Sequence, residues 1–148
     1  MSTAIDLACG LAKKFEGFRA KPYICPAGVP TIGYGSTRYL DGKKVTMQDA
    51  YISEPDAEKL LRDVMARCLR EACVVCPDLA KESEGRQAAI ADFVYNLGVA
   101  RLESSTLAKK INAGLWDDVP AQLRRWVYAG AVVLEGLRKR REAEIELI

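Results

Sequence analysis

Residues 16–35 read EGFRAKPYICPAGVPTIGYG, and this stretch decides the fold class of the chain. It combines prolines and glycines, which interrupt helices, with Tyr, Ile, Val and Thr, which favour strands. The sequence therefore predicts a small antiparallel β lobe over about residues 18–45. Its elements are short strands at Tyr23-Ile24, 31–34 and 38–40, and a hairpin turn at Asp41-Gly42.

Helical periodicity surrounds this stretch on both sides. Apolar residues from Ile5 to Phe15 recur at helical spacing and predict a helix over about 3–15, which ends near Glu16 and Gly17. The chain is expected to be helical from Thr46 onward. A helix start at residues 53–56 leads to a helix that ends near Cys73, and further helices are predicted over 84–96, 106–113, 119–128 and 135–148.

These elements predict an α+β fold in a single domain over residues 1–148. The β lobe, about 18–45, lies beside a mainly helical lobe formed by about 1–16 and 46–148. The first helix is too short to be stable alone, so it must pack with the other helices. A cleft is then expected between the two lobes, with Glu16 near the hinge.

The chain has 148 residues and no histidine. Ser-His-Asp and Cys-His nucleophilic sites need imidazole as the base, so these enzyme classes are excluded, as are zinc sites with histidine ligands. Acid–base chemistry must therefore come from Asp, Glu, Lys, Tyr or Cys. The 22 basic and 20 acidic residues give a net charge of +2, which does not indicate a nucleic-acid partner.

The chain contains five cysteines, so at least one thiol stays unpaired in a monomer. Cys73 and Cys76 alone cannot complete a zinc site with four ligands, and adding Cys68 gives a spacing that matches no common pattern. We interpret most of the cysteines as small buried hydrophobic residues. No metal and no other cofactor is expected.

The sequence contains no run close to the ~18 apolar residues of a membrane-spanning helix. The N-terminal stretch MSTAIDLACGLAKKF lacks a leading basic region and is interrupted by Asp6, which makes it a poor signal peptide. An export segment, if the natural protein has one, is expected to lie outside this sequence.

Glu16 is the first candidate for acid–base chemistry. It follows Ile5, Cys9 and Ala12 on one helical stripe, where a carboxyl group is partly desolvated and its protonated form is favoured. Composition alone favours the alternative, a solvated glutamate at a helix end. The residues that follow Glu16 favour the catalytic interpretation instead.

The segment from Glu16 to Gly35 resembles the active-site segment of the phage-type lysozymes, glycoside hydrolase family 24. Glu16, Cys25 and Thr31 fall on the family's spacing, which is a Glu, eight residues, an Asp or Cys, five residues and a Thr. Further matches follow in the family's order at residues 93–98, 105–107, 112–114, Trp126 and 136–142.

The resemblance implies a lysozyme-like fold and an N-acetylmuramidase, which cuts the β-1,4 bond between N-acetylmuramic acid and N-acetylglucosamine in peptidoglycan. Glu16 would protonate the leaving oxygen, and Thr31 would hydrogen-bond the attacking water of an inverting enzyme. Cys25 stands where many members have Asp, and it could act as base, as nucleophile or only as a polar group beside the water. A disulfide between Cys9 and Cys25, as in members held inactive at the membrane, is a further hypothesis.

Two neighbouring arginines compete for one supporting role. In the family an arginine of the last helix pairs with the catalytic glutamate, and the Gly-Leu-x-x-Arg-Arg motif gives this role to Arg140. Arg141 instead shares an apolar face with Leu137 and Ile145, and a buried arginine needs an anionic partner. The two interpretations differ by one residue.

Tyr34 and Asn96 are the candidate substrate-binding residues, and Asn96 could equally act at the helix end that precedes Gly98. Ser36 stands where members of the family often have histidine, which predicts a weaker hydrogen bond near the hinge. Trp126 is expected to belong to the core.

The main hypothesis is a phage endolysin that acts as a monomer on the glycan strands of peptidoglycan. It would be made in the host cytoplasm and would act on the cell wall, in the periplasm, after membrane permeabilisation or export. Contact with a membrane is expected only through a missing export segment. Two alternatives stay open: a lytic transglycosylase of the same fold, which would use Glu16 alone, and a non-catalytic peptidoglycan-binding protein.

Overall fold

The computed structural model describes residues 2–148, and its first helix, α1 (Ala4–Glu16), begins in a capping box. The Thr3 side chain accepts a hydrogen bond from the Asp6 backbone N–H, and the Asp6 carboxylate accepts one from the Thr3 N–H. At the other end, Gly17 adopts a φ of 70°, a left-handed value that glycine tolerates best. The chain therefore leaves the helix directly after Glu16 and turns into the β lobe.

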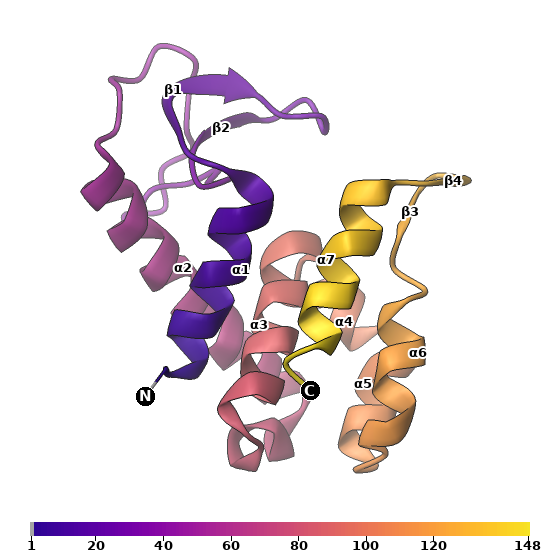
Figure 1. Cartoon of the computed structure of the whole chain (residues 1–148). Helices are drawn as coiled ribbons and strands as arrows, with labels where there is room; N and C mark the ends of the chain where they lie inside the picture. The colour runs from indigo at the N-terminus through magenta and orange to yellow at the C-terminus, as the bar shows by residue number, and fades with distance from the viewer. Residues whose placement is uncertain (1) are drawn as a thin grey trace.

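The β lobe is built on a two-stranded antiparallel sheet of β1 (Arg19–Ile24) and β2 (Pro30–Gly33). Tyr23 pairs with Thr31 across this sheet, and the register is irregular between Arg19 and Tyr23. Figure 1 shows the sheet above the helices, at the end of the molecule where α1 stops. The strand pair therefore lies next to the C-terminal end of α1, as the predicted architecture requires.

The rest of the β lobe is less regular than predicted. The prediction of a strand at 38–40 is wrong, because Arg38 makes only an isolated bridge with Lys44. The turn predicted at Asp41-Gly42 is confirmed, since the Gly42 N–H donates to the Tyr39 carbonyl at 3.0 Å. The prediction that the chain is helical from Thr46 onward is also wrong, because the next helix begins only at Glu54.

Eight further helical elements follow the β lobe within residues 2–148. They are α2 (Glu54–Val75), the 3-10 turn η1 (Pro77–Lys81), α3 (Glu84–Leu97), α4 (Val99–Glu103), α5 (Thr106–Asn112), the 3-10 turn η2 (Trp116–Asp118), α6 (Val119–Leu123) and, after a hairpin, α7 (Glu135–Ile145). The Ser53 side chain caps α2 by accepting from the Asp56 N–H, as predicted. In Figure 1, α2 runs from the β lobe into the helical lobe and so connects the two.

Helix α3 is the central element of the core. Its residues 88–94 are all buried, and it contacts α1, α2, α4 and α7. Phe93 packs edge-on against Trp126, with ring centroids 5.5 Å apart, so Trp126 belongs to the core side as expected. Because α1 and α7 both pack on α3, residues from the two ends of the chain meet beside it.

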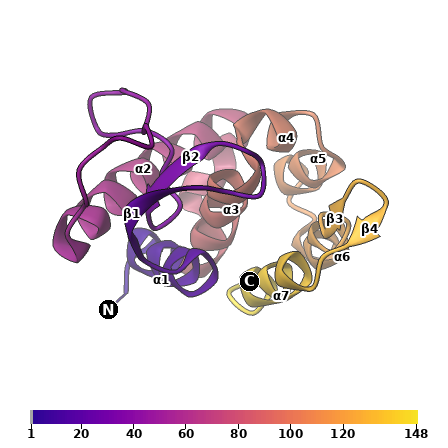
Figure 2. The ribbon, with the colours of Figure 1, turned by 90° about the horizontal axis from the view of Figure 1, so that it is seen from above.

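The C-terminal third differs most from the prediction. The expected helix over 119–128 stops at Leu123, and the chain forms a hairpin of β3 (Tyr128–Ala129) and β4 (Val132–Val133) instead. The last helix ends at Ile145, three residues before the end of the chain. Figure 2 shows this hairpin on the side of the molecule away from α2.

None of the helices within residues 2–148 has the length and apolar character required to cross a membrane.

Candidate active site

Glu16, the last residue of α1, lies where the helix meets the β lobe, and its side chain is 25% exposed. Gly35, just after β2, approaches it so closely that a Cβ atom at residue 35 would lie 2.8 Å from the carboxyl carbon of Glu16. Gly35 also has a φ of 82°. Glycine suits both conditions, and the missing Cβ lets the β lobe lie against the Glu16 carboxyl group.

Gly35→Ala should therefore damage the site. The added methyl group would displace the Glu16 carboxyl group, which we expect to lower activity by up to about 10²-fold, and the left-handed backbone adds a cost of about 1–3 kcal/mol in stability. Activity on peptidoglycan and thermal unfolding are the measurements. Gly10→Ala is the matched control, because a Cβ on Gly10 of α1 meets nothing within 4 Å and alanine favours a helix. A Gly35→Ala variant as active as Gly10→Ala would contradict this account of the motif.

Arg140 of α7 is the cation that pairs with Glu16. Its Nη1 donates to Glu16 Oε2 at 2.7 Å, while Nε and Nη2 donate to the two carboxylate oxygens of Asp92 at 2.9 and 2.7 Å. The structure therefore places at this contact the arginine that the motif indicates, Arg140. The sequence did not single out Asp92, a fully buried carboxylate on α3.

Arg141 as the partner of Glu16 is wrong. Neighbouring residues of a helix point in different directions, and the side chain of Arg141 is turned into the core. Its Nε lies 2.8 Å from Glu144 Oε1, and its Nη2 donates to Asn96 Oδ1 at 2.9 Å. The expectation that a buried arginine needs an anionic partner is confirmed, but that partner is Glu144.

Cys25 and Thr31 lie together at the end of the β1–β2 hairpin. The Thr31 hydroxyl donates to the Val29 carbonyl at 2.9 Å, and the Cys25 backbone N–H donates to the same carbonyl at 3.1 Å. A hydrogen bond from the Val29 backbone holds the pKa of the half-buried Cys25 thiol below its usual value, although burial opposes this shift. Cys25 is therefore the cysteine best prepared to ionise.

Tyr23 connects this hairpin to Glu16. Burial contributes most to the raised pKa of its hydroxyl, and the charge of Glu16 and then that of Cys25 contribute further. Tyr23 is the next-to-last residue of β1 and pairs with Thr31 across the sheet. It was not among the predicted site residues, although it stands within the quoted stretch.

Tyr34 and Asn96, the predicted substrate-binding residues, have internal partners. The hydroxyl of Tyr34 donates to Glu54 at 2.8 Å, and the backbone carbonyl of Tyr34 accepts from the Tyr95 hydroxyl at 2.6 Å. Burial and the contact with Glu54 raise the pKa of Tyr34 to about 12. The contacts of Tyr34 join the β lobe to α2 and α3, whereas Asn96 accepts from Arg141 within the helical lobe. Direct sugar contact by either residue stays a prediction.

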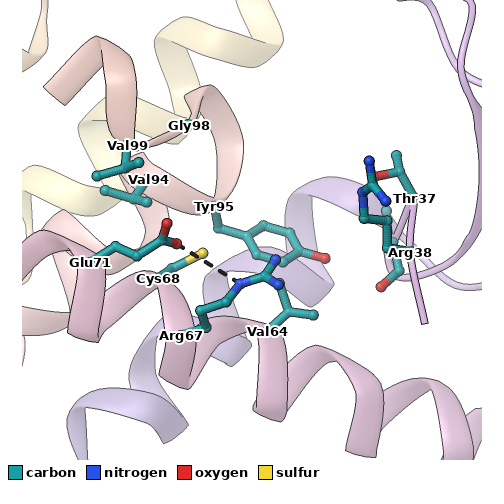
Figure 3. A pocket seen from close by; sticks show the side chains of 12 residues that line it. Thr37, Arg38, Val64, Arg67, Cys68, Glu71, Val94, Tyr95, Gly98 and Val99 are labelled. Carbon is teal, nitrogen blue, oxygen red and sulfur yellow. Dashed lines mark ion pairs between the residues drawn. The ribbon is translucent and has the colours of Figure 1, made fainter. Parts of the chain in front are cut away.

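A cavity of about 300 Å³ opens beside Gly35, between the β lobe and the helices. Figure 3 shows Thr37 and Arg38 on one side of it, and Tyr95, Cys68 and Arg67 on the other. Ser36 also lines the cavity, and its buried hydroxyl lacks a hydrogen-bond partner among the described residues. The expectation that serine in place of histidine weakens a hydrogen bond near the hinge stays a prediction.

All five cysteines are free thiols in the described structure, so Cys9 and Cys25 are not joined. Cys9, Cys68 and Cys76 are buried, as expected of small hydrophobic residues, and burial raises the pKa of each to between about 11 and about 12. No cluster of potential metal ligands is found within residues 2–148.

Comparison with known proteins agrees with this geometry. The model of the family described as phage lysozyme matches residues 13–144. The chain belongs to the phage lysozyme family. This lysozyme is 38% identical over 133 residues to the SAR-endolysin of Bacteriophage PS34, a match that covers 89% of this chain and 75% of the relative. It is 34% identical over 140 residues to the endolysin of Acyrthosiphon pisum secondary endosymbiont phage 1, over 90% of this chain and 89% of the relative.

Solved structures place the lysozyme in the same fold. The endolysin from Escherichia coli O157:H7 phage FAHEc1 superposes with a TM-score of 0.81 at 28% identity, over 95% of this chain and 89% of that one. The active form of the P1 phage endolysin Lyz shares the fold with a TM-score of 0.78 at 22% identity, over 95% and 82% of the two chains. The predicted lysozyme-like α+β fold is thus confirmed, and the chain is a peptidoglycan-hydrolysing enzyme. Neither a transglycosylase nor a non-catalytic binding protein is favoured.

Proposed function

We propose that this lysozyme cleaves the β-1,4 bond of the glycan strand with Glu16 as general acid. The observation that carries the proposal is the carboxyl group of Glu16, largely buried at the junction of the two lobes and oriented by Arg140 at 2.7 Å. A carboxyl group held in this way can protonate the leaving oxygen as the glycosidic bond breaks. The positive charge that develops on the sugar ring then needs a nucleophile on its other face.

We propose that Thr31 and Cys25 prepare a water molecule for this attack. Because the Thr31 hydroxyl donates its hydrogen to Val29, its lone pairs remain available to accept a hydrogen bond from water. A water that donates to Thr31 keeps a lone pair of its own for the sugar. The lowered pKa of Cys25 supports the first of its three open roles, a thiolate that accepts the second proton of the water.

The role of Cys25 as base predicts a graded set of activities. Cys25→Ser removes the ionisable group, and we expect a loss of about 10²–10⁴-fold. Cys25→Asp should keep activity and extend it to lower pH, since a carboxylate stays ionised at pH values where a thiol is protonated. The pH dependence of peptidoglycan hydrolysis, in reducing buffer, measures both effects.

Cys73→Ser is the matched control for Cys25→Ser, because Cys73 is likewise half-buried but lies on α2, away from the hairpin. We expect wild-type activity from it. Full activity of Cys25→Ser would overturn the role as base and leave Cys25 as a polar group beside the water at most.

The relatives' names, endolysin and SAR-endolysin, support peptidoglycan as the substrate and the cell wall as the place of action. We further propose synthesis in the host cytoplasm, action in the periplasm and a monomeric enzyme. Release of soluble muropeptides from purified Gram-negative sacculi tests the substrate. Sacculi that release nothing above a buffer control would contradict the assignment.

A further inference from the structure

A buried cluster of charged side chains lies behind Glu16, where α1, α3 and α7 meet. Asp92 and Glu144 are fully buried, Arg141 is fully buried, and Arg140 is 3% exposed. Charges that are this far from solvent interact strongly, so their arrangement affects any proton held nearby. The cluster therefore bears directly on how Glu16 can act as an acid.

The guanidinium group of Arg140 is divided unequally between two carboxyl groups. Asp92 receives the bidentate contact, with Nε and Nη2 on its two oxygens at 2.9 and 2.7 Å. Glu16 receives a single hydrogen bond, from Nη1 at 2.7 Å. The bidentate contact is the stronger and geometrically more specific one, so Asp92 fixes the plane of the guanidinium and Nη1 is left to orient Glu16.

This arrangement resolves a chemical conflict. A general acid must keep its proton until the substrate takes it, whereas a cation 2.7 Å away favours the loss of that proton. We infer that Asp92 is a positioning residue whose carboxylate balances the charge of Arg140, so that Arg140 orients Glu16 without removing its proton. The inference rests on the proposed role of Glu16 as general acid.

The state of Asp92 fits this role. Burial alone would raise the pKa of Asp92, but the charge and hydrogen bonds of Arg140 outweigh burial and hold it below its usual value. Glu144 faces Asp92 from α7 and pairs with Arg141 at 2.8 Å. Burial, followed by the contact with Asp92, raises the pKa of Glu144, although the charge of Arg141 opposes this rise.

Three further titratable groups interact electrostatically with Glu16 or Asp92, and each is uncharged near neutral pH. They are Tyr23 of β1, Tyr95 of α3 and Cys68 of α2, and burial is the main cause of the raised pKa of each. None of them can replace the charge of Asp92. Within the described residues, Asp92 is therefore the carboxylate available to balance Arg140 when Glu16 is protonated.

The test is the pH–rate profile of the full chain with Asp92→Asn. Loss of the proton from a general acid lowers the rate on the alkaline side of such a profile, its alkaline limb. Asparagine keeps the shape of aspartate but leaves Arg140 unbalanced, so the Glu16 carboxylate is favoured. We expect the limb to move to lower pH by roughly one unit, with activity about tenfold lower on that limb and an unchanged KM.

The double variant Asp92→Asn/Arg140→Gln separates charge from packing. It removes the unbalanced cation, so the alkaline limb should return towards its wild-type position even though the second substitution weakens the fold further. A merely structural role of Asp92 predicts no such return. Rates are referred to the folded fraction, measured by circular dichroism.

The inference about Asp92 would be overturned if the alkaline limb of Asp92→Asn lay at its wild-type pH. It would also be overturned if the limb of the double variant did not return towards the wild-type pH. Glu16→Gln keeps the two claims separate. If Glu16→Gln is inactive while Asp92→Asn keeps the wild-type limb, the general acid stands and the inference fails. If Glu16→Gln is fully active, the proposed role of Glu16 fails as well.

Discussion

Glu16→Gln is expected to lower the rate of peptidoglycan hydrolysis by about 10²–10⁴-fold while leaving the fold intact. The amide matches the carboxyl group in size, and its oxygen can still accept the hydrogen bond from Arg140 Nη1. It has no acidic proton to give to the leaving oxygen, so the chemical step fails while the site keeps its shape. Initial rates of muropeptide release from purified sacculi measure the effect.

Glu58→Gln is the matched control for this change. Glu58 also pairs with a cation, Lys13 at 2.7 Å, but its side chain is 43% exposed on α2 and has no place in the proposed site. We expect wild-type activity and a stability change below about 1 kcal/mol. Equal rates for Glu16→Gln and Glu58→Gln would remove Glu16 from the mechanism.

Arg140→Leu should have the largest effect on stability. It leaves the fully buried carboxylate of Asp92 without its bidentate partner, which costs about 3–5 kcal/mol when one member of a buried pair is removed. It also releases Glu16, so activity should fall even in the folded fraction. Chemical denaturation and hydrolysis rates measure the two effects separately.

The stability effect of Arg140→Leu should depend on pH in a defined direction. The pKa of Asp92 in the folded wild type lies below its ordinary value of 3.8, so its contribution to stability is present above that value and is lost as the pH falls. In the variant, the unpaired Asp92 can relieve its burial by taking up a proton. The difference in unfolding free energy between wild type and variant should therefore narrow as the pH is lowered.

Arg138→Leu makes the same chemical change on the exposed face of α7. Arg138 pairs with Glu135 at the surface, and its side chain is 49% exposed, so we expect little change in stability and no change in activity. A similar loss of stability in Arg138→Leu and Arg140→Leu would show that the buried ion pair contributes no more to stability than the exposed one.

Glu16, Cys25 and Thr31 were predicted from the resemblance to the phage-type lysozymes, and the local structure around them is one that the sequence itself indicates. Gly17 ends α1, and the prolines and glycines that follow allow only a short hairpin. The choice between Arg140 and Arg141 was not predictable from periodicity. Helix α7 buries two adjacent arginines, and only the positions of α1 and α3 decide which carboxyl group each one meets.

Asp92 and the β3–β4 hairpin were missed for different reasons. Asp92 stands in a run of buried residues on α3, which is a signal for a paired charge, but its partner lies 48 residues away in sequence. The hairpin carries a local signal in the Gly130-Ala131 loop between two short strands, and Gly130 adopts a φ of 62°. The hairpin was missed because residues 119–128 were predicted to be helical. The tertiary context of this segment overrides the propensity of a short stretch.

The central claim, hydrolysis by a water attacking opposite the Glu16 acid, is tested most directly by the products formed in ¹⁸O-labelled water. Purified peptidoglycan is digested with the enzyme in this solvent, and the new muropeptide ends are analysed by mass spectrometry. The account predicts reducing N-acetylmuramic acid ends that carry one ¹⁸O atom from the solvent. Unlabelled 1,6-anhydro-muramic acid ends would contradict it, because they form without any attack by water.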